Sequence, residues 1–568
     1  MPNTLDTLPL ELLDMILSNI TSQKDLKQVC EVCIRLWDCA IPHLYRCLVL
    51  TTPDPSCNEL TDAVNSIPKR YVRHIRDFEL RIPIFERECS HCKHRDNVWV
   101  GEEDAFFAKG LHRFFEGIED EATGGKIRDE VCAFHTLMHA LYDLHFLDNQ
   151  LRSFRWNIGM CIPNILLCTN EISLLRKQRN IESLTLHTEF NCSLGVGSSS
   201  VDLAHFPKLR SLSWKGLNKY SDFECLKDWI RVHGHRIVSL TLDLVSWHRA
   251  KKIWTDGLRQ QSDKKEIDNF LTHSVLSAKA EDERIMFQAL EYLDLIENLK
   301  TLKLRKCIES QKWLELVSSS RKLTKLKYFE LFLTSSEPKT TTKKICDFIE
   351  RAPRLEALCL MLCEPIDWDS IMRTVRRCSS LTRFSMHSLV DQGMQGLITR
   401  DIPWPSGLEQ LLQDKQLAFF GTSTPPRELA SQLQNLQARP LCKLLHIRAT
   451  GMVMMDLIYD GYPVFDQKSV DEYCDFDPSY EPRDIHKFAE WAFSSDGLPN
   501  LIVLAYGDFS HENHYWPYNM FLYNTKAGYR RYDPAEILRW DLVNDNIDML
   551  AACPFEDITD LESDGLFY

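Results

Sequence analysis

Three short segments at the start of the chain carry apolar residues at helical spacing. In the first segment these residues fall at i, i+1, i+4 and i+5, as Leu12, Leu13, Ile16 and Leu17. Pro9 precedes them and suits a first helical turn, where its missing N–H is not needed. Thr21 or Ser22 can cap the second segment, with Asp25 as the acid of a capping box. The pattern predicts a three-helix bundle with more apolar surface than so small a core can bury.

Beyond this bundle one hexapeptide pattern, apolar-x-x-apolar-x-apolar, returns along most of the chain. Its copies are Tyr45–Leu50, Ile75–Leu80, Leu151–Trp156, Ile181–Leu186, Leu209–Trp214, Ile237–Leu242, Leu299–Leu304, Leu326–Leu331, Leu355–Leu360 and Leu381–Met386. Several neighbouring copies start 26 to 29 residues apart, and helical stripes lie between them. Repeats of about 20–29 residues with this pattern are typical of leucine-rich repeats. We therefore predict an α/β fold: a small helical head followed by a right-handed β/α leucine-rich-repeat solenoid.

The spacing also predicts where the repeats are interrupted. We expect the helical head over residues 1–48 and degenerate repeats over 49–390, with insertions near 83–150 and 246–290. The stretch 391–440 is rich in Gly and Pro, including Pro425 and Pro426, and predicts a loop-rich break. Residues 441–568 are expected to hold terminal repeats and a C-terminal cap. After Arg539 the chain has eight acidic residues and no Lys or Arg, which predicts a polar, acidic tail.

The first helical segments resemble a known motif. The run Leu-Pro-x-Glu-Leu-Leu-x-x-Ile-Leu starts at Leu8, and is followed by Asp25-Leu26, Val29-Cys30 and Leu44-Tyr45-Arg46. Together they resemble an F-box, over residues 4–48. One departure is visible: the position where an F-box usually has an aromatic residue holds Leu36, and Trp37 comes one place later. Either side chain is a candidate for that position.

The resemblance implies a partner and a role. F-box motifs bind the Skp-type adaptor of a cullin–RING ubiquitin ligase, so the chain is expected to be a non-catalytic substrate receptor. The residues expected to face the adaptor are Leu8, Pro9, Leu12, Leu13, Ile16, Leu26, Val29, Val32, Leu36 and Trp37. Two alternatives stay open: a non-degradative scaffold that uses the same head outside a ligase, and a plain helical cap on a larger fold.

Composition narrows the class of partner. The formal net charge is −14, which argues against nucleic acid and against anionic membranes as partners. No apolar run approaches the roughly 20 residues that a membrane-spanning helix needs, and the first residues do not resemble a secretory signal. Many of the 20 cysteines lie at core-like positions, which fits reduced thiols. We therefore expect a protein of the cytoplasm or the nucleus.

A search for catalytic and metal-binding motifs finds little. The chain lacks a phosphate-binding glycine loop and a G-x-S-x-G nucleophile motif, so we expect no enzymatic activity and no cofactor. One cluster is a weak zinc candidate. Cys89 and Cys92 form a C-x-x-C pair, and His135 and His139, with Cys132 nearby, lie one helical turn apart downstream. The alternative is a solvated loop followed by a helix with surface histidines.

The strand pattern also predicts a surface for a protein substrate. Residues between the core positions of successive repeats line up in columns on the concave face of such a solenoid. One column contains His187, Lys215, Asp243, Arg305, Phe332, Met361 and His387, and Lys303 lies in the adjacent column. The predicted contact residues are Lys303, Arg305, Phe332, Met361 and His387, suited to an acidic or phosphorylated segment with an apolar anchor. The alternative is that the C-terminal cap or the 391–440 segment covers them.

Overall fold

The computed structural model of the chain is mixed α/β. It describes residues 8–20, 22–51, 58–81, 136–158, 175–188, 201–217, 220–244, 296–305, 314, 323–333, 338–391, 397–400, 405, 407–415, 417–436, 439–449, 483–510, 519–525, 528–532 and 541–554. The chain divides into two compact units. Unit 1 contains Met1–Arg236 and His248–Lys279, and unit 2 contains Ile237–Trp247 and Ala280–Tyr568.

Unit 1 begins with three helices: α1 (Leu10–Ser18), α2 (Gln23–Cys30) and α3 (Ile34–Leu44). The predicted cap of the second helix is confirmed, because the Ser22 side chain accepts a hydrogen bond from the backbone N–H of Asp25. Leu17, Leu26 and Ile41 lie in the core of this bundle. The bundle therefore buries one stripe from each helix, as the helical spacing predicts.

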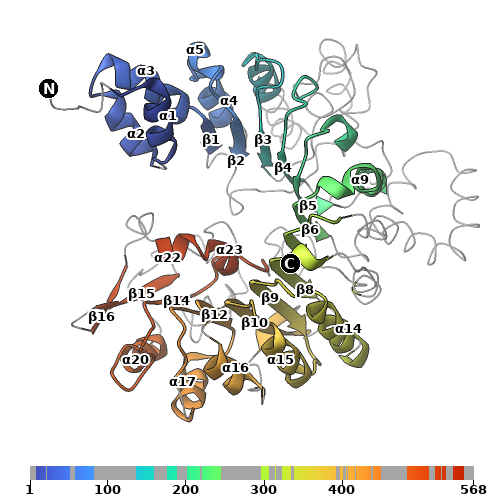
Figure 1. Cartoon of the computed structure of the whole chain (residues 1–568), viewed down its shortest axis with the longest axis vertical. Helices are drawn as coiled ribbons and strands as arrows, with labels where there is room; N and C mark the ends of the chain where they lie inside the picture. The colour runs from blue at the N-terminus through green and yellow to red at the C-terminus, as the bar shows by residue number, and fades with distance from the viewer. Residues whose placement is uncertain are drawn as a thin grey trace, which may run out of the picture. The chain divides into compact units, whose positions relative to one another are not determined.

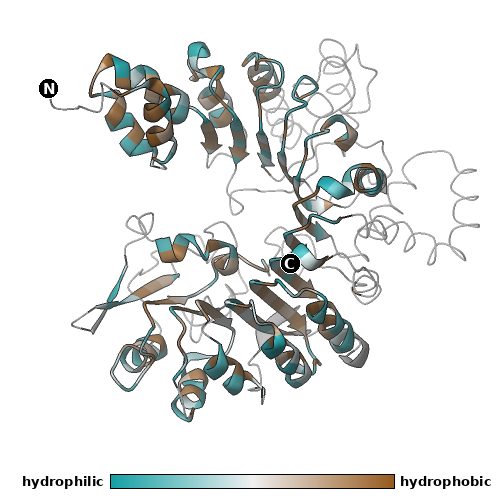
Figure 2. Ribbon diagram, viewed as in Figure 1, coloured by the Kyte–Doolittle hydropathy of each residue, from teal (hydrophilic) through white to brown (hydrophobic). Residues whose placement is uncertain are grey.

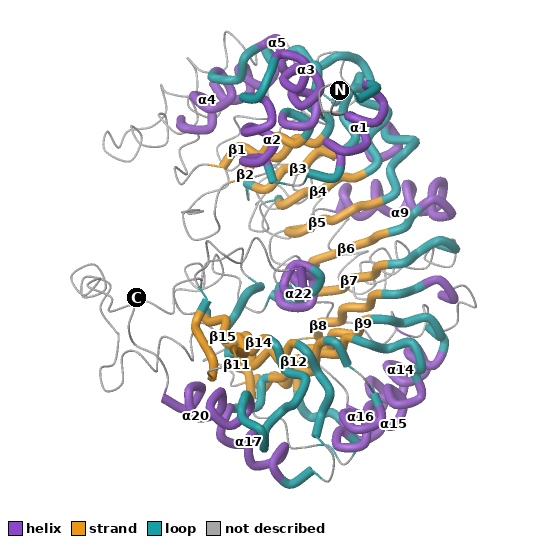
Figure 3. The backbone as a smooth tube through the Cα atoms, turned by 60° about the vertical axis from the view of Figure 1, so that its left-hand side comes forward, coloured by secondary structure: helices purple, strands orange, loops and turns teal. Residues whose placement is uncertain are grey.

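A parallel sheet follows in unit 1 (Figures 1 and 3). Its strands pair in chain order: β1 (Cys47–Thr51), β2 (Asp77–Arg81), β3 (Ser153–Asn157), β4 (Ser183–His187) and β5 (Ser211–Leu217). The helices between them include α4 (Asn58–Asn65), α5 (Lys69–Val72), residues 136–142, η4 (Leu203–His205), α9 (Tyr220–His233) and η5 (Gly234–Arg236). In β4 and β5 buried residues alternate with partly exposed ones, so one face of these strands is packed and the other is more open.

Unit 2 contains a longer sheet. The strands β6 (Ser239–Leu244), β7 (Thr301–Arg305), β8 (Tyr328–Leu333), β9 (Ala357–Cys363), β10 (Arg383–Asp391), β12 (Phe419–Thr422), β13 (Leu444–Ile447) and β14 (Val503–Tyr506) run parallel in that order. Antiparallel strands complete it: β15 (Met520–Thr525) and β16 (Gly528–Arg531) follow β14, and β11 (Leu397–Arg400) pairs with β10.

Helices cover the sheet of unit 2 on one face: α14 (Pro338–Glu350), α15 (Trp368–Arg377), α16 (Leu408–Asp414), α17 (Pro426–Gln434) and α20 (Arg483–Ala492) (Figure 1). Two short helices, α22 (Asp541–Asn544) and α23 (Ile547–Leu550), lie over the opposite face (Figure 1). We call residues 541–554 the C-terminal segment. Every residue of β8, β9, β12, β13 and β14 is buried, and β8 and β9 are mostly apolar along their length (Figure 2). These strands therefore have cover on both faces.

The predicted hexapeptides are confirmed as strands, since each one overlaps a strand from β1 to β10. The predicted break at 391–440 is wrong for the residues described there. Residues 407–436 form α16, β12 and α17, and β12 continues the parallel sheet beside β10. The proline pair that suggested a loop starts a helix instead, with Pro425 as its N-cap and Pro426 in its first turn.

The predicted insertion at 83–150 is too long at its C-terminal end. Residues 136–142 are helical, and Leu137, Leu141 and Leu144 are fully or almost fully buried, so this part belongs to the packed repeat before β3. The insertion near 246–290 lies outside the described residues, as does most of the first. Nor is residue 48 a boundary between compact units, because both the helical head and β1–β5 belong to unit 1. Within the described part of the chain, no helix combines the length and apolar character needed to cross a membrane.

Candidate functional site

The helical head of unit 1 has an uncovered apolar face. On α1, the large side chains of Leu10, Leu12, Met15 and Ile16 are exposed. Val32 and Ile34, between α2 and the start of α3, are 70% and 82% exposed. Arg35 Nη2 donates a hydrogen bond to the Leu8 carbonyl at 2.6 Å, which ties the start of α3 to the residues before α1. The start of α3 therefore lies beside the residues before α1. We call the exposed apolar side chains of α1 and of Val32 and Ile34 the head's apolar face.

Other apolar side chains of the three helices form the core of the head. Leu13, Leu26 and Leu36 are buried, and Leu36 is only 3% exposed. These three candidates for direct adaptor contact are therefore wrong as surface residues, because their side chains pack inside the bundle. Trp37 is 41% exposed, so of the two alternatives Trp37 is the one whose side chain can reach a partner. Among the other candidates, Leu12, Ile16, Val32 and Pro9 are exposed, while Leu8 and Val29 are intermediate.

The head is joined firmly to the first strand of unit 1. The rings of Tyr45 and Tyr71 stack with centroids 4.3 Å apart, and Tyr71 from α5 completes the core of the head. Gln23 Nε2 donates to the carbonyl of Cys47, the first residue of β1, at 3.3 Å. These contacts make the head and the start of the sheet one packed body rather than two parts on a flexible linker.

The second candidate site is the predicted substrate surface on the sheet of unit 2. The register confirms the predicted columns: Phe332 pairs with Met361, and Met361 pairs with His387. In the adjacent column Lys303 pairs with Glu330, and Glu330 with Cys359. Sequence spacing therefore predicted correctly which side chains share this face.

The prediction that this face is exposed to solvent is wrong. Phe332, Met361 and His387 are fully or almost fully buried. The C-terminal segment packs in one apolar cluster with Phe332 and Met361. Val543, Met549 and Leu550 of the segment join the same apolar cluster as Phe332 and Met361. The segment is thus the cover that the sequence left as an alternative, and residues 541–554 of the predicted polar, acidic tail pack against the sheet. Residues 555–568 lie outside the described residues.

Lys303 and Arg305 converge on a buried carboxylate. Arg305 Nε lies 2.6 Å from Glu330 Oε1, and Lys303 Nζ lies 3.6 Å from Glu330 Oε2. Burial by itself would raise the pKa of Glu330, but Arg305 and Lys303 lower it to about 2. The carboxylate also accepts a hydrogen bond from the backbone N–H of Cys553 at 2.7 Å. The two predicted cations therefore neutralise a carboxylate that holds the C-terminal segment.

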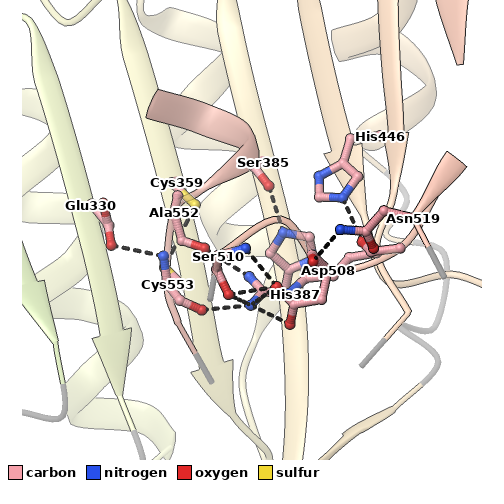
Figure 4. A network of polar contacts seen from close by, with 12 residues as sticks. Glu330, Cys359, Ser385, His387, His446, Asp508, Ser510, Asn519, Ala552 and Cys553 are labelled. Atoms are coloured by element: carbon pink, nitrogen blue, oxygen red, sulfur yellow. Dashed lines mark hydrogen bonds and ion pairs between the residues drawn. The ribbon is translucent and has the colours of Figure 1, made fainter. Parts of the chain in front are cut away.

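A second buried network surrounds Arg448, which follows β13. Its partners Asp508, Ser510, Ala552 and Cys553 are labelled in Figure 4. Arg448 Nη2 lies 3.0 Å from Asp508 Oδ2 and donates to the Cys553 carbonyl at 2.7 Å. Its Nη1 donates to the Ala552 carbonyl at 2.8 Å, and Ser510 Oγ accepts from Nη2 at 2.8 Å. Both members of the ion pair are almost fully buried. Such a charge is tolerated in the interior only when partners surround it, as they do here.

Two histidines lie beside this network. His446 Nε2 donates to the Gly507 carbonyl at 3.0 Å, and His387 Nε2 lies 2.7 Å from Ser385 Oγ. Burial and the nearby positive charge of Arg448 hold the pKa of His387 well below its usual value. Burial also lowers the pKa of His446, to about 4. Both imidazoles are therefore neutral at physiological pH.

Cys553 is held in an unusual backbone conformation. Its φ of 51° lies in the left-handed region, which costs a non-glycine residue about 1–2 kcal/mol. The N–H is bound by Glu330 and the carbonyl by Arg448, and its Sγ lies 3.6 Å from Cys359 Sγ on β9. A strained residue persists where its surroundings hold it on several sides, so this position is an anchor of the C-terminal segment.

Sequence reasoning missed Arg448, Asp508 and Cys553, because their partners are far away along the chain. One signal for the cover was present. In β9, and in β8 apart from Glu330, the apolar residues run without alternation, unlike the alternating pattern of β7. Continuous apolar runs in a parallel sheet indicate strands that are buried on both faces.

The weak zinc candidates are untested. Cys89, Cys92, Cys132 and His135 lie outside the described residues, and His139 is exposed on the helix 136–142. Among the described residues, no group of three or more potential ligands is placed to hold a metal ion. The zinc site therefore stays a prediction.

Comparison with known protein families and with curated proteins finds no relative of this chain. No protein-family model matches the chain, and no curated protein matches it significantly. The assignment of a function therefore depends on the two sites just described: the head's apolar face and the covered face of unit 2.

Proposed function

We propose that the chain is the substrate-recognition subunit of a Skp–cullin–F-box ubiquitin ligase. In this proposal residues 1–48 are the F-box, and the β/α repeats beyond them form a leucine-rich-repeat solenoid that binds a protein substrate. The chain holds the substrate close to the ubiquitin-loaded enzyme, which the cullin–RING part of the ligase brings. Such a receptor works in the cytoplasm or the nucleus.

A single observation carries the proposal: α1 is apolar on two sides. Leu13 and Leu17 pack into the head, while Leu12, Met15 and Ile16 at i, i+3 and i+4 stay exposed. A helix that is apolar nearly all round belongs in an interior, so the outer side of α1 fits a protein partner. Within the F-box resemblance, Leu12 and Ile16 are among the residues that a Skp-type adaptor would cover.

The packing of the head supports the same role. A receptor must hold its substrate at a defined distance from the adaptor, because proximity accelerates transfer only when the geometry is set. The stacked Tyr45 and Tyr71 fix the head to the first repeat. An F-box on a flexible tether would lack this property.

The experiment is a binding measurement between the full-length chain and a purified Skp-type adaptor. Replacing Leu12 and Ile16 with Asp puts two charges into the proposed contact, and we expect at least about a 100-fold loss of affinity. Val232→Asp is the matched control, because Val232 is also an exposed apolar residue on a helix, α9, outside the head. Its affinity should equal that of the unchanged chain.

The outcomes are distinct. Full adaptor affinity in a folded Leu12→Asp, Ile16→Asp variant would show that the F-box assignment is wrong. If the adaptor binds through this face but cullin does not co-purify with the complex, the chain acts as a scaffold outside a ligase.

A further inference from the structure

The face of unit 2 beneath the C-terminal segment is unusually polar for a buried surface. Glu330, Arg448 and Asp508 are all at most 2% exposed. A sheet face that only needs to bury a terminal cap gains more from apolar side chains, since replacing buried ion pairs by apolar residues is often neutral or stabilising. These buried charges are therefore better explained by the recognition of a peptide than by the burial of a cap.

Glu330 and Arg448 bind backbone groups of the C-terminal segment. Glu330 accepts from the N–H of Cys553, and Arg448 donates to the carbonyls of Ala552 and Cys553. Tyr328 Oη donates to the carbonyl of Asp548 at 3.0 Å. Main-chain contacts of this kind give affinity for an extended or turning peptide, and side-chain pockets give the specificity.

Specific side-chain recognition is present as well. Arg383 Nη1 lies 2.8 Å from Asp548 Oδ1 and also donates to the carbonyl of Asp545. After Asp548 come two apolar residues, Met549 and Leu550, that enter the apolar cluster, and then the small buried pair Ala552 and Cys553. The recognised pattern is thus an acidic residue, two apolar residues, one free position and two small residues.

Charge complementarity points in the same direction. The chain beyond Arg539 has eight acidic residues and no basic one. On the face that receives it, Lys303 and Arg305 pair with Glu330, and Arg448 pairs with Asp508. Arg383 pairs with Asp548 of the segment, so a ligand for this face needs an acidic residue at that position.

We propose that the face formed by β7–β10 and β13 is a peptide-recognition surface whose ligand in the isolated chain is the C-terminal segment. An acidic segment of a protein partner with the same pattern of side chains replaces it. That this partner is a ubiquitination substrate rests on the proposed function, whereas the replacement of the segment does not. The segment occupies the surface at a high effective concentration because it is tethered, so a partner must compete with it.

The test uses the full chain with a protease site placed within residues 533–540, between β16 and α22. After cleavage both pieces remain present, and a fluorescein-labelled synthetic peptide of residues 541–554 is added in excess. We expect the peptide to replace the cleaved segment, with a rise in fluorescence anisotropy, whereas a peptide of scrambled sequence should not bind.

Matched variants locate the site. Arg383→Gln removes the partner of Asp548, and we expect at least about a tenfold weaker binding of the peptide. Arg376→Gln is the control, because Arg376 pairs with Asp414 at 2.7 Å on the helical face of the sheet. Adaptor binding is measured on the same samples. A loss of adaptor binding then tests the proposed function, and a loss of peptide binding tests the peptide-recognition surface.

Failure to incorporate peptide in a cleaved chain that remains folded would overturn the proposal and make the segment a permanent part of the core. If cleavage unfolds unit 2, hydrogen exchange on the uncut chain decides. The proposal requires amides of 541–554 to exchange through a local opening, well before those of β9. Exchange of both regions only in one common unfolding event would contradict it.

Discussion

At the scale of single residues, the most informative group is Arg448. Its side chain is 1% exposed, and its guanidinium contacts the Asp508 carboxylate and two backbone carbonyls of the C-terminal segment. One side chain thus links β13, the turn after β14 and the end of the described chain. Its energetic role is large because loss of the guanidinium would leave the buried Asp508 carboxylate without its counter-charge.

Neutralising the partner of Arg448 should be costly. We expect Asp508→Asn to reduce the stability of unit 2 by about 3–5 kcal/mol, since it leaves a buried cation without its counter-charge. Glu350→Gln is the matched control: Glu350 pairs with Arg377 at the same 3.0 Å distance, but on the surface. It should change stability by less than about 1 kcal/mol. Hydrogen exchange at the amides of β13 and β14 measures both effects, and equal effects would contradict the argument.

The buried histidines predict a dependence of stability on pH. The pKa of His446 is depressed to about 4 from its usual 6.5, and that of His387 is also lowered. The unfolded chain therefore binds these protons near pH 6.5 while the folded chain does not. Stability is present above pH 6.5 and is lost as the pH falls toward 4.

Each histidine should change the unfolding equilibrium by up to about tenfold per pH unit in that window. The groups that face them are Arg448, which disfavours protonation, and Asp508, which favours it. A His387→Gln, His446→Gln variant should show a shallower loss of thermal stability between pH 6.5 and 5 than the unchanged chain. An identical slope would mean that other groups control the acid sensitivity.

At the scale of elements, α1 shows how one helix serves two surfaces. Leu13 and Leu12 are neighbours in sequence, yet they are 0% and 45% exposed. Helical geometry turns successive residues by about 100°, so adjacent leucines point to different sides. The first holds the head together, and the second is free to contact a partner.

The two leucines should therefore respond differently to the same substitution. We expect Leu13→Ala to reduce the stability of the head by about 2–5 kcal/mol, through lost burial and the cavity that remains. Leu12→Ala should change it by less than about 1 kcal/mol. Hydrogen exchange at the amides of α2 and α3 provides the measurement, and a large effect of Leu12→Ala would place that side chain in the core.

At the scale of the whole molecule, the two units carry different sites. The head's apolar face belongs to unit 1, and the network around Arg448 belongs to unit 2. Among the described residues, none of the hydrogen bonds or ion pairs of Arg448 involves a residue of the head.

Sites without shared partners usually make independent contributions. We therefore expect Asp508→Asn to leave the affinity of the full chain for a Skp-type adaptor within about twofold of the original value. The measurement is the same titration that tests the head. A large loss would show that the two units are energetically coupled.

The sequence by itself determined the strands β1 to β10 and which of their side chains align, but not α16, β12 and α17. The hexapeptide Leu326–Leu331 predicts β8, and Leu355–Leu360 predicts β9, because apolar residues at the first, fourth and sixth positions are a local property of the repeat. The same spacing aligned Phe332 with Met361 and His387. The two faces of α1 also follow from local helical geometry.

Only the tertiary structure decided what lies on each face. Whether Phe332 and Met361 meet solvent depends on Leu550 and Cys553, about 200 residues further along the chain. Which leucine of the head becomes core likewise depends on how α1 packs against α3. Period and spacing record which side chains point the same way, but the segment that buries them is set by contacts between distant parts of the chain. The apolar runs of β8 and β9 indicate that a cover exists, but they do not indicate which segment supplies it.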